Sequence, residues 1–153
     1  MPIETRLFVK ASLIWLLATF AFGAVMIGAK ALGIAFPVDA PVMHAHMGFI
    51  GWLVNLVMGI ALWFLPVNRE RFKQNRGRYP AGAVQLVFAL LNAGLVARMV
   101  AEPLFDRAVA TALTSAVLIL SGVMQFTAVL IFVLIAWSRV RNVSTATREF
   151  TES

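Results

Sequence analysis

The sequence predicts an all-α membrane protein, a bundle of four transmembrane helices, and two observations support this prediction. Of the 153 residues, 61% are hydrophobic and only 13% are charged, and the mean hydropathy is +0.86. A soluble domain carries about twice this share of charged residues. Four apolar stretches, at residues 7–32, 42–66, 81–97 and 108–137, are each long enough, with short flanks, to cross a hydrocarbon core about 30 Å thick.

The ends of the four spans follow from local signals. Span one is too long for the apolar core of a signal peptide, so we expect it to remain as a helix. Pro41 can open span two, because proline suits the first turn of a helix. Span three is the shortest and ends near Arg98, whereas span four is long enough to tilt. We expect one membrane domain over residues 1–141 and a polar cytoplasmic tail over residues 142–153.

The basic residues indicate the orientation. Most of them precede or open span one, lie between spans two and three, or follow span four: Arg6, Lys10, Arg69, Arg71, Lys73, Arg76, Arg78, Arg139, Arg141 and Arg148. Only Lys30, Arg98 and Arg107 lie at the opposite ends of the spans. By the positive-inside rule, both termini and the second loop face the cytoplasm of a multi-pass protein in the bacterial inner membrane. This placement favours membrane lipid, and not nucleic acid, as the partner of the net charge of +6.

Two histidines, the only ones in the chain, open span two in the run Met43-His44-Ala45-His46-Met47. An imidazole in a membrane helix is costly unless something binds it. At helical spacing, the face of His44 is small and partly polar, with Gly48, Gly51, Asn55 and Gly59. Such a face admits a second helix or a flat macrocycle. The face of His46 is apolar, so we expect His44 to point into the interior.

Haem b is the first of three interpretations of the histidines. Iron in a porphyrin readily takes an axial imidazole, and the absence of cysteine excludes covalent attachment of haem. Residues two apart on one helix cannot ligate both faces of a haem, so a bis-histidine site would need a second copy of the chain. Otherwise a methionine is the sixth ligand, or the iron stays open to a gas. Arg98, at the same end of the bundle, could pair with a propionate or with Glu102.

The other two interpretations need no haem. Copper suits the mixture of imidazole and thioether in His44, His46 and Met47, although a further methionine or a second chain would have to complete the site. Alternatively, both histidines are interfacial residues that hydrogen-bond to water and lipid headgroups, in a structural subunit without a cofactor.

The stretch from His44 through Gly51-Trp52 to Gly59 and Leu65-Pro66 resembles the second helix of subunit I of haem–copper oxidases and nitric oxide reductases. It is most similar to the short stand-alone homologues of that subunit, and the end of span four, residues 121–139, resembles their closing helix. The resemblance implies that His44 or His46 ligates a low-spin haem near the outer face. The family's opposing haem ligand and copper-centre histidines have no counterpart here, so we do not expect a complete oxidase.

Together these observations predict a self-associating membrane protein that binds haem b through His44 or His46, with Gly48, Gly51 and Arg98 around the cofactor. Its expected work is electron transfer, with a redox partner protein, or the sensing or handling of nitric oxide or oxygen. An oxidoreductase component is compatible with this expectation. A copper-binding protein and a cofactor-free structural subunit remain the alternatives.

Overall fold

The computed structural model describes residues 1–73, 77–106 and 111–140, and within these ranges the protein is entirely helical. Its elements are α1 (Ile3–Ala31), α2 (Ala40–His46), η1 (Met47–Val54), α3 (Asn55–Phe64), α4 (Ala81–Asp106) and α5 (Ala112–Trp137). The second, third and fourth of these run on as one rod, Ala40–Phe64, which we call span two. The described part of the chain thus holds four helical rods long and apolar enough to cross a membrane. This confirms the predicted fold class.

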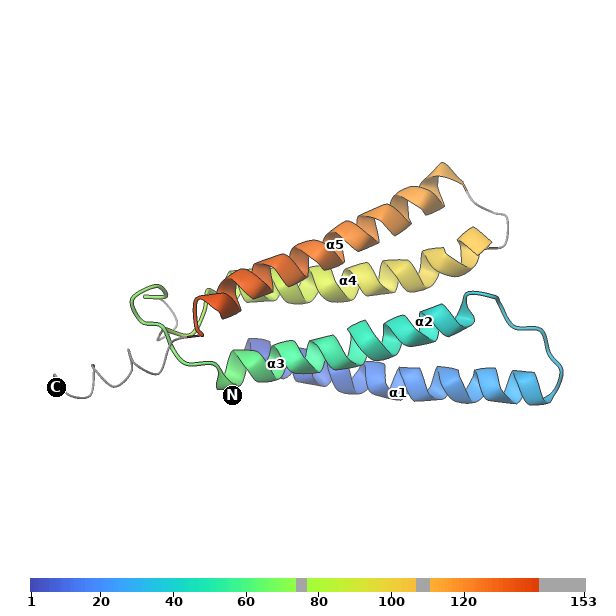
Figure 1. The fold of residues 1–153 in the computed structure, drawn as a ribbon, viewed down its shortest axis with the longest axis horizontal. Helices are drawn as coiled ribbons and strands as arrows, with labels where there is room; N and C mark the ends of the chain where they lie inside the picture. Colours follow the sequence, from blue (N-terminus) through green and yellow to red (C-terminus); the bar gives the residue numbers. More distant parts are fainter. Residues whose placement is uncertain (74–76, 107–110, 141–153) are drawn as a thin grey trace.

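Two antiparallel hairpins make up the bundle (Figure 1). The first pairs α1 with span two, and the second pairs α4 with α5; packing within each hairpin is far more extensive than packing between them. The beginning of α1, the end of α5 and the loop between α3 and α4 lie at the same end (Figure 1). We call this the loop-69 end, after Arg69 in that loop, and the opposite end the histidine end. The charge pattern predicts that the loop-69 end faces the cytoplasm.

The hydrophobic core lies toward the loop-69 end. Its buried members come from all four rods and the second loop: Phe8, Met58, Leu62, Tyr79, Val84, Val87, Leu91, Ala128 and Ile135. Across the two hairpins, Phe8 and Phe88 pack edge to face, with their ring centroids 5.2 Å apart. Aromatic rings favour this arrangement over face-to-face contact. The hairpins are therefore joined most firmly at the end remote from the histidines.

A buried arginine closes the end of span two. Arg139 follows α5, is 1% exposed, and donates to the carbonyl oxygens of Leu62, Leu65 and Pro66. The Leu62 carbonyl is among the last of α3, which have no partner within the helix, and Leu65 and Pro66 directly follow that helix. The Arg139 guanidinium also lies over the ring of Tyr79, 5.7 Å from its centroid. Arg139 thus ties the C-terminal end of one hairpin to the end of the other.

Glycines let α1 and span two approach each other closely. A Cβ atom built on Gly51 would lie 2.6 Å from Cγ of Trp15, and one built on Gly59 would lie 3.0 Å from Cβ of Phe8. Small residues on a membrane helix permit such contacts, and packing of this kind drives helix association in lipid. The sequence predicts that the small face of span two meets a second helix or a flat macrocycle. In the structure, α1 of the same chain covers this face.

Two asparagines link the hairpins in the middle of the bundle. Asn92 Nδ2 donates to Asn55 Oδ1 at 3.0 Å, and Asn55 Nδ2 donates back to Asn92 Oδ1 at 3.3 Å. Trp15 Nε1 donates to the same Asn92 oxygen at 3.1 Å. The network joins α1, span two and α4, and Asn55 is fully buried. Polar side chains of membrane helices commonly form such interhelical hydrogen bonds.

Some helix ends differ from the prediction. Helix α4 does not stop near Ala97 but continues to Asp106, and Arg98 Nε donates to Glu102 Oε1 one turn later, at 3.1 Å. Such i, i+4 pairs support a helix past a charged residue. Helix α5 begins at Ala112, where Thr111 and Thr114 form a reciprocal capping box. The predicted roles of Arg76, Arg107, Arg141, Arg148 and the tail lie outside the described residues.

Alanine at Gly51 should destabilise the protein, by about 1–3 kcal/mol, because its methyl group would overlap the Trp15 ring. Gly122 in α5 is the matched control, since a Cβ atom there has no neighbour within 4 Å. Gly122→Ala should be neutral or stabilising by up to about 1 kcal/mol, because alanine favours a helix over glycine. Unfolding in a graded series of denaturing detergent measures both variants. Equal stability of the two would contradict the close packing described here.

Tyr79 should report the integrity of the loop-69 end, because it is the single tyrosine of the chain and is fully buried. Burial raises the pKa of its hydroxyl above the ordinary value of about 10. The neutral form is therefore favoured by folding, and this contribution to stability is present below pH 10 and is lost as pH rises through the folded-state pKa. Ultraviolet titration should show tyrosinate forming at higher pH in the folded protein than in denaturing detergent. Coincident titrations would show that Tyr79 is exposed.

Candidate functional site

His44 lies in the last turn of α2 and packs against α1. A Cβ atom on Gly23 would lie 2.9 Å from Cε1 of the His44 ring, so the imidazole occupies space that only a glycine leaves. The ring stacks on Phe22, with the centroids 6.4 Å apart and the planes inclined by 24°. His44 Nδ1 is buried and has no hydrogen-bond partner. A buried polar atom without a partner is unusual in a folded protein and requires an explanation.

A cavity of about 340 Å³ opens beside the His44 ring. Its other lining residues all belong to α1: Thr19, Phe20, Gly23, Ala24 and Ile27. Phe20 and Ile27 are 72% and 73% exposed, so the cavity faces the surroundings of the bundle, which are lipid tails if α1 crosses the bilayer. The hydroxyl of Thr19 donates to the Trp15 carbonyl one turn earlier. The cavity is thus an apolar recess with an imidazole as its main polar group.

His46 faces the other hairpin. Its Nδ1 lies 3.6 Å from Glu102 Oε2 on α4, and Arg98 pairs with the other oxygen of the same carboxylate. The 3.6 Å separation is beyond hydrogen-bonding reach, and both facing atoms are buried without a hydrogen-bond partner. The two groups are therefore close to each other without a hydrogen bond between them. The sequence predicts an apolar face for His46, but in the structure Glu102 of α4 lies beside this histidine.

The structure thus divides the predicted site residues between two faces of span two. His44 shares the α1 side with Gly48, whose added Cβ would lie 3.4 Å from Thr19 Cγ2, and with Gly51, which Trp15 covers. His46 and Arg98 meet on the α4 side through Glu102. Met47 opens η1 and is half-buried. The predicted inward direction of His44 agrees with its contact with Gly23, but α1 lies where Gly48 and Gly51 were expected to meet a porphyrin.

A π-helix separates the histidines from the middle of the membrane. Residues Met47–Val54 form η1, and Asn55 Nδ2 donates to the carbonyl oxygens of Ile50 and Gly51, at 3.2 and 3.0 Å. Hydrogen bonds of a π-helix skip one residue more than those of an α-helix, and such turns are frequent at functional sites. The π-turns change the helical phase between Asn55 and the histidines. The π-helix therefore affects which neighbour each imidazole meets.

The sequence pattern does not identify two residues of this site, Gly23 and Glu102. Gly23 is the residue that makes room for the His44 ring, and nothing in span one distinguishes it from the other glycines of that span. The spacing of four residues predicts only that Glu102 pairs with Arg98. Its approach to His46 depends on how the two hairpins meet, which no local pattern encodes.

The recess offers a cofactor one imidazole, that of His44. In the ranges that the structure describes, no group of three or more histidine, aspartate or glutamate side chains could hold a metal ion. Copper or zinc held by one chain alone would need such a group or methionine ligands. Haem iron already has four nitrogen ligands in the porphyrin and needs only an axial imidazole. The unpartnered Nδ1 of His44 and the apolar recess beside it fit this requirement.

Searches against protein-family models, curated proteins and solved structures found no match to this chain.

Proposed function

We propose that this chain is an integral membrane protein that binds haem b through His44, near the histidine end of the bundle. The single observation that carries the proposal is the His44 imidazole, which lines an apolar recess of about 340 Å³ and has a buried nitrogen without a partner. The resemblance of the span-two motif to oxidase subunit I supports it independently. Bound haem would supply one-electron redox chemistry or a coordination position for nitric oxide or oxygen.

Each residue around the recess has a role in the proposal. Gly23 and Phe22 hold the His44 ring in place, the first by leaving space and the second by stacking. Phe20 and Ile27 line the recess and are exposed, so its outer side is apolar. Arg98 does not line the recess, because it lies on the α4 side of span two, where its Nε donates to Glu102. The carboxylate of Glu102 holds His46 on the α4 side, away from the recess.

The recess alone does not enclose a haem, which raises the question of what covers the rest of it. It is open to the surroundings of the bundle, and one chain offers one axial imidazole on the α1 side. We propose that a second copy, or lipid, covers the rest of the macrocycle. Electron transfer would favour a six-coordinate iron, with the last ligand from a second chain or a methionine, whereas handling of a gas would favour a five-coordinate iron.

Replacement of His44 should abolish haem binding, because no other side chain lines the recess with a ligating nitrogen. We expect His44→Ala to weaken haem affinity more than the roughly hundredfold that loss of a supporting residue costs, and His46→Ala to weaken it by about tenfold or less. Titration of apo-protein in detergent, followed at the Soret band, measures both. Complete loss in both variants, or in neither, would contradict a single axial ligand on the α1 side.

The same titrations with copper separate the alternatives. Tight copper binding by the wild type, without haem binding, would instead support the copper interpretation of the Met-His-x-His-Met run. A wild type that binds neither, with His44→Ala and His46→Ala as stable as the parent, would support the cofactor-free subunit.

The recess can also be tested without removing a ligand. Gly23→Ala places a methyl group 2.9 Å from His44 Cε1, so the ring must move. Gly28→Ala in the same helix is the control, because an added Cβ there has no neighbour within 4 Å. We expect Gly23→Ala to weaken haem binding about tenfold and to shift the Soret band, and Gly28→Ala to do neither. Equal behaviour of the two variants would place the haem away from α1.

A further inference from the structure

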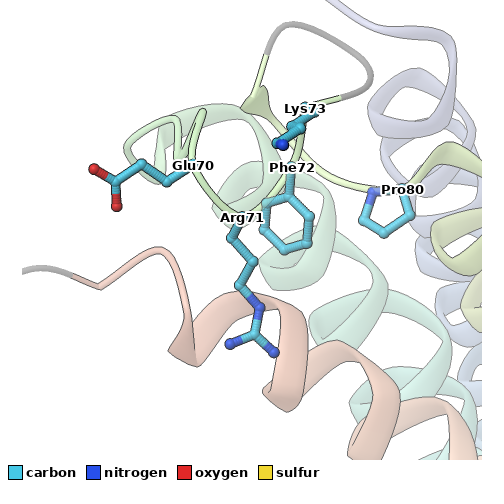
Figure 2. Close-up of a pocket in the computed structure, with 5 residues that line it drawn as sticks. All are labelled: Glu70, Arg71, Phe72, Lys73 and Pro80. Atoms are coloured by element: carbon cyan, nitrogen blue, oxygen red, sulfur yellow. The ribbon is translucent and has the colours of Figure 1, made fainter.

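A second cavity lies at the loop-69 end, far from the histidines in the sequence and at the opposite end of the helices. It has a volume of about 290 Å³ and is lined by Glu70, Arg71, Phe72, Lys73 and Pro80 (Figure 2). The first four residues belong to the loop after α3, and Pro80 directly precedes α4. The cavity is therefore formed where the two hairpins are connected.

The loop that lines this cavity is held by specific bonds. Asn68 Nδ2 donates to the Ser138 carbonyl at 2.8 Å, and Asn68 Oδ1 accepts from the Arg71 amide at 3.1 Å. The Phe72 amide donates to the Asn68 carbonyl at 2.9 Å, and the Phe72 side chain packs against the hydrophobic core. Because Phe72 is anchored inward, the residues on either side of it, Arg71 and Lys73, are held at the rim of the cavity.

The charges around the cavity favour an anion. Arg71 and Lys73 are exposed, and no acidic side chain of the described residues forms an ion pair with either. The carboxylate of Glu70 points away from Phe72 and Pro80 (Figure 2). Phe72 and Pro80 supply the apolar wall of the cavity, and the Arg71 and Lys73 side chains extend in different directions on either side of the Phe72 ring (Figure 2). Two cations beside an apolar wall match a ligand with an anionic head and a hydrocarbon body.

The depth of the loop relative to a bilayer indicates that the ligand is a lipid. Trp63, near the end of α3, lies under the Arg78 guanidinium, which is 5.2 Å from the ring centroid. Tryptophan at the end of a membrane helix is typical of the headgroup region of a bilayer. Basic pockets beside transmembrane helices on the cytoplasmic side bind the headgroups of anionic lipids. We propose that the cavity binds the phosphate of an anionic phospholipid through Arg71 and Lys73, with Phe72 and Pro80 against its glycerol and upper acyl carbons.

The test uses the full-length protein in a neutral detergent, with phosphatidylglycerol and phosphatidylcholine added separately and bound lipid counted by native mass spectrometry. We expect phosphatidylglycerol to bind preferentially, and Arg71→Gln and Lys73→Gln each to weaken its binding about fivefold. Arg6→Gln is the control: Arg6 is an exposed cation at the same end of the bundle, outside the cavity. It should change binding less than twofold. Arg71→Lys, which keeps the charge, should retain binding.

Three outcomes would overturn the proposal. Equal weakening by Arg6→Gln would show a diffuse charge effect without a site. Displacement of phosphatidylglycerol by millimolar inorganic phosphate would show a site for small free anions. Equal binding of phosphatidylcholine would show that the two cations do not select the headgroup. All variants should unfold at the temperature of the wild type in lipid-free detergent, because the substituted side chains are exposed.

Discussion

The close packing of α1 against the glycine face of span two is the contact on which the rest of the structure depends. Helices in lipid gain little from hydrophobicity alone, because the tails around them are equally apolar, so close packing and interhelical hydrogen bonds must hold them together. Gly51 admits the Trp15 ring, and the Trp15 indole in turn donates to Asn92 on the other hairpin. The same approach brings α1 near enough to the start of span two for Gly23 to receive the His44 ring.

The two ends of the bundle differ in how firmly they are held, and the difference suits the proposed function. At the loop-69 end, the Arg139 guanidinium satisfies carbonyls of span two, and Tyr79 and Phe8 fill the core. At the histidine end, Nδ1 of His44 and Oε2 of Glu102 remain without hydrogen bonds. A membrane protein can retain such atoms where a ligand satisfies them, since leaving them unpaired in an apolar medium costs free energy. Stability is thus concentrated away from the proposed cofactor.

The sequence predicts the spans well, because hydropathy over about twenty residues is a local property. It also places Gly51 on the side of span two that bears His44, and both residues lie against α1 in the structure. It does not predict the π-helix over Met47–Val54, which Asn55 follows with a side-chain hydrogen bond to the Gly51 carbonyl. Nor does it predict that Trp15 covers Gly51 or that Glu102 meets His46, because both contacts depend on which helices become neighbours.

The central claim is that the His44 imidazole, held against α1, is an axial ligand of haem. The absorption spectrum of the wild-type protein, purified from membranes in a mild detergent and recorded oxidised and reduced, tests this claim most directly. Ligation of haem by His44 predicts a Soret band and the sharpened visible bands of a reduced b-type haem. Acidic organic solvent should release this haem, because no cysteine attaches it. A colourless protein that also fails to take up added haem would contradict the account.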